Sequence, residues 1–210
     1  MDPESFRERV ESAKATELGR LGSNKLLVAV TDAELDERSV LTAAAHSEHA
    51  ARETFRRWAD DEGDAEARAA FERVAEQEAD HLERVLDALD EPVDLADGGP
   101  MHAYLRGREG TVERVAAGLV GRGLVVRRTH TQIISFFVNE ADERRADLFR
   151  DLKGETEAEI DAGLDLLVGL CADESDWDRA AAAAEYVIQV AYDDYADALT
   201  GLGIDPKPVC

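Results

Sequence analysis

The sequence contains only two cysteines, Cys171 and Cys210, among 210 residues. They are too few and too far apart to provide a disulfide framework or a paired-cysteine motif. Apolar runs are short as well: Leu26–Val30 is far below the roughly 20 residues of a membrane-spanning helix. The first residues, MDPESFRERV, are charged and lack the apolar centre of a signal peptide. We therefore expect a soluble cytoplasmic protein without a membrane partner, in which Cys210 lies in a mobile tail.

Basic residues are scarce relative to acidic ones. Lysine occurs four times, and 24 lysines and arginines stand against 47 aspartates and glutamates, so the formal net charge is -23. A surface of this sign repels phosphates, and nucleic-acid binding is not expected. The acidic excess is typical of adaptation to a salt-rich cytoplasm, where a Debye length of about 3 Å at 1 M salt screens self-repulsion. A surface built for a basic partner is the alternative interpretation.

Only five prolines occur, near the two ends and in one central loop, Glu91–Pro100. No segment alternates polar and apolar residues as a strand does, so we expect an all-α fold. Long helices joined by short turns are antiparallel neighbours, which predicts a four-helix bundle in a single domain, residues 1–210. The expected core helices cover about 36–61, 65–89, 109–139 and 141–171, and the flanking helices cover about 3–21 and 177–202.

A weak internal repeat supports two similar hairpins. When the chain is shifted by 78 residues, Phe71 aligns with Phe149, together with other apolar pairs. Such a repeat predicts a bundle with approximate twofold symmetry. The third core helix contains three closely spaced glycines, which indicate either close helix packing or a break: Gly118, Gly121 and Gly123.

Acidic and histidine residues replace apolar residues on the inner faces of the first two core helices. The inner positions of the second helix, spaced three and four residues apart, are Phe71, Val74, Glu78, His81 and Val85. Those of the first helix are Leu41, Ala44, Glu48, Ala51, Phe55 and Trp58. Burying two carboxylates and an imidazole is costly unless something compensates them, and a metal ion would do so. Glu48 precedes Glu78 by 30 residues, which places it across the hairpin at a similar height.

The two segments HSEHAARETFRRWAD and AFERVAEQEADHLERVL resemble the first half of the ferritin-like superfamily, the rubrerythrin branch in particular. In that family a glutamate on one helix is followed by Glu-x-x-His on the next. The resemblance covers residues 44–89 well. It implies that Glu48 is a terminal carboxylate ligand, that Glu78 bridges two metals, and that His81 is the nitrogen ligand.

The second half of the chain departs from this family pattern. The 78-residue shift places Val126, Thr156 and Glu159 where the family has another glutamate and another Glu-x-x-His. Oxygen ligands remain available there in Glu155 and Glu159, and His130 lies on the expected inner face. An intact di-iron centre is therefore not expected.

We expect a single ion bound by the three ligands of the first half together with Glu159. Carboxylate oxygens and one imidazole suit iron(II), manganese or zinc. A metal-free site, in which Arg127 or Arg128 pairs with the carboxylates, is the alternative that the sequence leaves open.

Three functional hypotheses follow. The first is a metal protein that handles oxygen, peroxide or iron in redox or oxidative-stress chemistry; with no cysteine-rich rubredoxin module in the sequence, it would need an external electron donor. The second is a metal-free bundle that acts as an interaction scaffold, with a second copy of the chain as a candidate partner. The third is a hydroxylase acting on an organic substrate. The other histidines, His46, His49 and His102, are expected on the surface.

Overall fold

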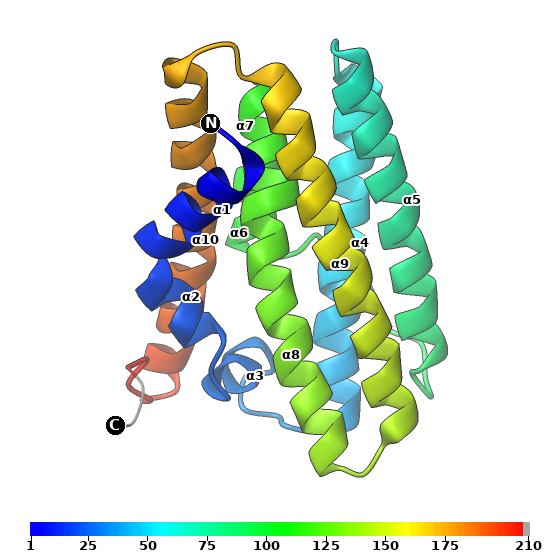
Figure 1. Ribbon diagram of the computed structural model, residues 1–210. Coiled ribbons are helices and arrows are strands. Elements are labelled where there is room, and N and C mark those ends of the chain that lie inside the picture. Colours follow the sequence, from blue (N-terminus) through cyan, green and yellow to red (C-terminus); the bar gives the residue numbers. More distant parts are fainter. Residues whose placement is uncertain (208–210) are drawn as a thin grey trace.

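The computed structural model describes residues 1–207, and every regular element in that range is a helix (Figure 1). The expected all-α class is thus confirmed for the described residues. Within the same range, no helix is both long enough and apolar enough to cross a membrane. The expectation of a mobile tail at Cys210 concerns a residue outside the described range.

Two long helical hairpins form the centre of the molecule. The first hairpin consists of α4 and the antiparallel α5. The second begins with one continuous helix, made up of α7, a π-helical segment η1 and α8, which is followed by the antiparallel α9. Figure 1 shows the hairpins side by side, with α9 against α5. The elements are α4 (Glu37–Asp61), α5 (Ala65–Asp87), α7 (Thr111–Val115), η1 (Ala116–Arg122), α8 (Gly123–Asn139) and α9 (Glu143–Leu170).

The remaining helices cover one side of the second hairpin. The last long helix, α10 (Glu174–Gly201), runs along α7 and η1, and α1 (Pro3–Ala13) packs on both α9 and α10 (Figure 1). The single helix expected over residues 3–21 is divided at Lys14, whose φ of -114° and ψ of 25° are not helical. The other short helices are α2 (Ala15–Leu21), α3 (Lys25–Val30) and α6 (Pro100–Arg106).

Aspartate side chains cap the N-termini of several helices. Each accepts a hydrogen bond from a backbone N–H of the first turn, which the helix itself leaves unpaired. A negative charge at this end also interacts favourably with the helix dipole. Part of the acidic excess therefore determines where helices begin: at Asp2, Asp36, Asp64, Asp142 and Asp173.

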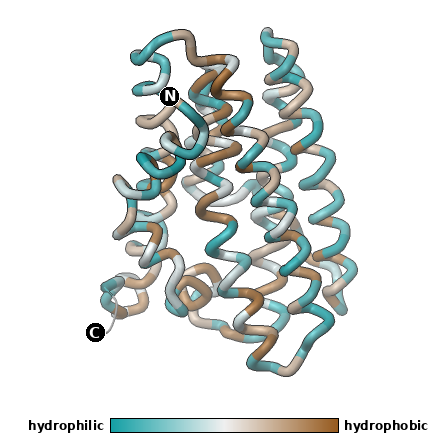
Figure 2. The backbone as a smooth tube through the Cα atoms, viewed as in Figure 1, coloured by the Kyte–Doolittle hydropathy of each residue, from teal (hydrophilic) through white to brown (hydrophobic). Residues whose placement is uncertain are grey.

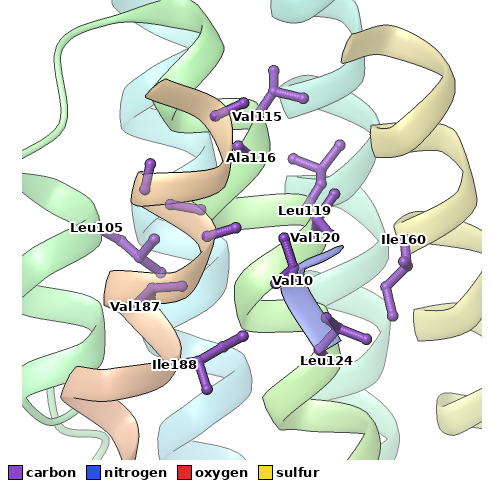
Figure 3. Close-up of a cluster of buried hydrophobic side chains, with 14 of the residues drawn as sticks. Val10, Leu105, Val115, Ala116, Leu119, Val120, Leu124, Ile160, Val187 and Ile188 are labelled. Carbon is purple, nitrogen blue, oxygen red and sulfur yellow. The ribbon is translucent and has the colours of Figure 1, made fainter. Parts of the chain in front are cut away.

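All the long helices bury apolar side chains in the core. Figure 2 shows hydrophobic and hydrophilic residues interspersed along these helices. Figure 3 shows one region of this core, where Leu119 and Leu124 of the second hairpin lie near Val10 of α1 and Val187 and Ile188 of α10. Burying an aliphatic side chain of this size contributes about 1.5–3 kcal/mol. Through this packing, α1 and α10 are held against the second hairpin.

The three glycines predicted to mark close packing or a break are points of close helix approach. A Cβ on Gly118 would lie 2.6 Å from the Trp58 ring of α4, and a Cβ on Gly121 would lie 2.7 Å from the Ala184 carbonyl oxygen of α10. Gly123 approaches a side chain of α9 equally closely, at 2.5 Å. The helix is not broken here, but it continues through the π-helical segment, a conformation that is frequent near functional sites.

Candidate metal centre

The polar residues predicted on the inner faces of α4 and α5 are buried. Glu48, Glu78 and His81 are 1%, 2% and 1% exposed, respectively. His130 on α8 and Glu159 on α9 are buried as well. Each of the two helices in each hairpin therefore contributes at least one ionisable side chain to the region between the hairpins.

Glu48 is held through one of its two carboxylate oxygens. The Nε2 atom of His130 lies 3.3 Å from Glu48 Oε1. The His130 ring in turn packs against Phe149, with 5.8 Å between the ring centroids, which restricts its orientation. The other oxygen, Glu48 Oε2, has no hydrogen-bond partner within residues 1–207.

Glu78 is anchored in the same way by a buried arginine. The Nη2 atom of Arg122 donates to Glu78 Oε1 at 2.7 Å and to both oxygens of Glu159 at 2.7 and 2.9 Å. Arg122 is completely buried; its Nε donates to the Gly118 carbonyl oxygen, and its guanidinium lies 5.1 Å from the centre of the Phe55 ring. Glu78 Oε2 has no partner among the described residues.

His81 is oriented by a carboxylate on α9. Its Nε2 lies 2.7 Å from Glu155 Oε2, and Arg84 donates to the other oxygen of Glu155 at 2.9 Å. When Nε2–H donates to the carboxylate, the second ring nitrogen is available as a ligand. That atom, His81 Nδ1, has no hydrogen-bond partner in residues 1–207, and it lies 3.9 Å from Glu48 Oε2 and 3.9 Å from Glu78 Oε2.

Three unpartnered ligand atoms, one each from Glu48, Glu78 and His81, thus converge within 4.8 Å of one another. Metal–ligand bonds of about 2.0–2.2 Å let two ligand atoms of one ion lie up to about 4 Å apart. The 3.9 Å separations from His81 Nδ1 therefore fit a single ion. Two carboxylate oxygens and an imidazole nitrogen are donors that iron(II), manganese and zinc accept.

In the absence of a cation, burial and the neighbouring charges shift the pKa values of these residues. Burial raises the pKa of Glu78 well above its ordinary value, and the neighbouring Glu48 carboxylate adds to the effect. Burial alone would also raise the pKa of Glu48, but the proximity of Glu78, His130 and His81 holds that pKa well below its usual range. Burial acts to lower the pKa of His81, and the Glu48 and Glu155 carboxylates outweigh it and raise the pKa. In the metal-free centre, Glu48 is therefore the more acidic and Glu78 the less acidic of the two carboxyl groups.

No family model, curated protein or solved structure matches this chain. The function of this chain is therefore inferred from the geometry of the site. Its distinctive element is the set of three ligand atoms that neighbouring groups leave free.

Glu155, Glu159 and His130 are the candidate ligands predicted in the second half of the chain. In the structure they contact the three ligand residues, or the arginine that anchors one of them. Both oxygens of Glu159 accept from Arg122, and His130 holds Glu48. Glu155 lies on the far side of the His81 ring, at Nε2. The structure thus places these three residues around the ligand atoms without adding a fourth atom to the converging group of described residues.

The structure corrects two details of the sequence interpretation: which arginine pairs with the carboxylates in the metal-free alternative, and where His102 lies. Arg127 and Arg128 do not pair with the buried carboxylates. They form ion pairs with Glu11 of α1, on the side of α8 that packs against α2. His102, expected on the surface, is only 3% exposed, because α6 packs against α4 and α10. His46 and His49 are partly exposed, as expected for positions beside the inner face.

Arg122 is the functional residue that the pattern analysis missed. The sequence does carry a signal for it, since Arg122 is the single charged residue within Val115–Val126, VAAGLVGRGLVV. It also precedes Val126 and His130 at intervals of four, on the face already assigned to the interior. A lone arginine at such a position requires a buried anionic partner.

Proposed function

We propose that this chain is a ferritin-like metal protein that binds one divalent ion, iron or manganese, between Glu48, Glu78 and His81. One observation carries the proposal: each of these side chains is anchored through one polar atom and presents its other polar atom, unpartnered within residues 1–207, to a common point. A purely structural polar network would be expected to satisfy these buried atoms.

The charge balance favours one ion over two. Glu48, Glu78 and Glu159 carry three negative charges when ionised, and Arg122 carries one positive charge, so a formal charge of -2 remains in a buried region. One divalent cation would neutralise it. The Arg122 guanidinium lies between Glu78 and Glu159, where it takes the place of a second cation.

The arrangement of the long helices is consistent with a ferritin-like bundle. In such bundles, glutamates and a Glu-x-x-His pair on facing helices project into the core. Here α4 supplies Glu48 and α5 supplies the Glu78–His81 pair, while the second hairpin supplies Arg122 and Glu159 in place of a second ligand set.

A bound iron or manganese ion would supply one-electron chemistry towards oxygen or peroxide. The residues of the chain would prepare the site for that ion. Glu155 would keep a proton on His81 Nε2, so that Nδ1 remains a ligand, and Glu78 would release its proton as the ion binds. The surrounding helices bury the site from bulk water, and an external donor would deliver electrons.

Metal analysis of matched variants tests the proposal. The wild-type chain, purified at molar KCl to screen its net charge of -23, is expected to bind one equivalent of iron(II) or manganese. Glu78→Gln should abolish stoichiometric binding, measured by elemental analysis after anaerobic loading. Glu76→Gln is the control, since it makes the same charge change at an exposed position of the same helix.

Circular dichroism would establish that both variants are folded. Loss of metal in Glu78→Gln but not in Glu76→Gln would support the site. A wild-type chain that binds no stoichiometric metal, or two variants that bind equally, would refute it. The metal-free interaction scaffold would then be the better description.

A further inference from the structure

A cavity of about 390 Å³ lies beside the candidate metal centre. It is bounded by α3, α4, α6, α8 and α10 and by the loop that precedes α6. Its walls are largely aliphatic and include Leu26, Val40, Ala44, Ile133 and Ala191. The volume falls within the range of about 300–1,000 Å³ in which protein pockets bury small organic molecules.

One buried polar side chain lines this cavity without a partner. His102 is 3% exposed, and neither of its ring nitrogens has a hydrogen-bond partner within residues 1–207. Gly98, at a φ of +76°, lets the loop run directly over the ring: a Cβ there would lie 2.9 Å from His102 Cδ2 and 2.6 Å from Ala50 Cβ. A buried imidazole with no hydrogen bond is destabilising unless a bound molecule supplies one.

The charge of the cavity restricts what it can accept. Among the described residues that line it there is no lysine or arginine, and Asp194 of α10 lies at its exposed edge. Burial, together with the charges of Arg122 and Arg106, lowers the pKa of His102 to about 3. At neutral pH the ring is therefore uncharged and offers one donor and one acceptor. An anion would meet Asp194 and, among the described lining residues, no lysine or arginine to pair with it.

We propose that this cavity binds a neutral, largely apolar organic molecule that carries one hydroxyl or carbonyl group, which forms a hydrogen bond with His102. The aliphatic walls hold the body of the molecule, and His102 sets its orientation. Ala44 and Glu48 are one helical turn apart on α4, so the bound molecule lies next to the metal ligands. Binding itself requires no metal, and the proposal can be tested independently of the metal centre.

Three probes that share one aromatic ring system test the proposal: naphthalene, 2-naphthol and 2-naphthoate. Equilibrium dialysis against the full chain, repeated after removal of metal with EDTA, measures their affinities. We expect 2-naphthol to bind about three- to tenfold more tightly than naphthalene, the effect of one buried neutral hydrogen bond. The anion 2-naphthoate should bind more weakly than either, and EDTA should leave this order unchanged.

Two variants locate the binding site. His102→Leu should lose the preference for 2-naphthol, because the polar partner is gone and the apolar walls remain. Ala191→Leu, which fills part of the cavity from α10, should weaken both neutral probes and retain the preference of the wild type. The proposal is overturned if the wild type binds no probe, if it does not prefer 2-naphthol, if it binds 2-naphthoate as tightly, or if Ala191→Leu has no effect.

Discussion

The Arg122→Met substitution removes a guanidinium that two buried carboxyl groups share. Arg122 is 0% exposed and donates to Glu78 and Glu159 at 2.7 Å each. Methionine fills a similar volume without charge. Deleting one partner of a buried ion pair costs about 3–5 kcal/mol, because the other partner stays buried without compensation. For a chain of this length, about 2–4 °C per kcal/mol converts the loss to a fall in Tm of about 6–20 °C.

The pH dependence of this loss follows from the carboxyl groups. Burial already raises the pKa of Glu78 and of Glu159, and both rise further when Arg122 is absent. A carboxyl group whose pKa is raised in the folded state destabilises the fold as the pH rises above its ordinary pKa near 4.5. The variant should therefore approach the wild type in stability as the pH is lowered from 8 towards 5.

Urea titrations of the metal-free protein at pH 8 and at pH 5 measure both effects. Arg73→Met is the control, because it makes the same substitution at an exposed position of α5. The double variant Arg122→Met with Glu159→Gln should recover most of the loss, since the unpaired carboxyl group is then neutral.

Metal binding supplies a second readout: without Arg122, the space between Glu78 and Glu159 should admit a second divalent ion. If Arg122→Met stays within about 1 kcal/mol of the wild type at pH 8, where an uncompensated buried charge should cost far more, the reasoning is refuted.

Lowering the pH from 7 to 5 should destabilise the wild type by about 2 kcal/mol more than it destabilises His102→Leu. In the unfolded wild type the imidazole takes up a proton below about pH 6.5, whereas the folded ring, with a pKa of about 3, does not. Urea titrations at both pH values measure the difference, and equal losses would contradict the prediction. Glu155→Gln should weaken metal binding about 10- to 100-fold by releasing the orientation of His81, and calorimetric titration with manganese measures the change. Gly121→Ala should destabilise the protein by about 1–3 kcal/mol, because the added methyl group overpacks against α10. Gly154→Ala should stabilise it by about 0.5–1 kcal/mol, because Gly154 is exposed on α9 with open space around it. Thermal unfolding of the two variants measures both changes.

The inner faces of α4 and α5 could be predicted because side chains on one face of a helix recur every three or four residues, whatever surrounds the helix. Glu48, Glu78 and His81 stood out as polar residues at apolar positions, and all three are buried. Their height across the hairpin followed from the short turn between the two helices. Periodicity along one or two helices therefore locates a set of residues that share an interior.

The partners of those residues could not be predicted in this way. Arg122 reaches Glu78 and Glu159 from a third helix, across sequence separations of 44 and 37 residues. It is the last residue of the π-helical segment, and its position depends on the close approach that the neighbouring glycines allow. His102 was misplaced for a related reason: seven residues of α6 contain too little pattern to indicate that two other helices and a loop cover them.

The order of apolar and polar residues along the chain, by itself, determined that this protein is helical, where its long helices run and which of their faces turn inward. Those properties are local, because backbone hydrogen bonds and side-chain spacing within one helix specify them. Only the tertiary structure decided which ligand atoms are left free, that a buried guanidinium stands beside them, and that a cavity lies next to them. These features depend on the separation and rotation of whole helices, which packing among distant segments sets.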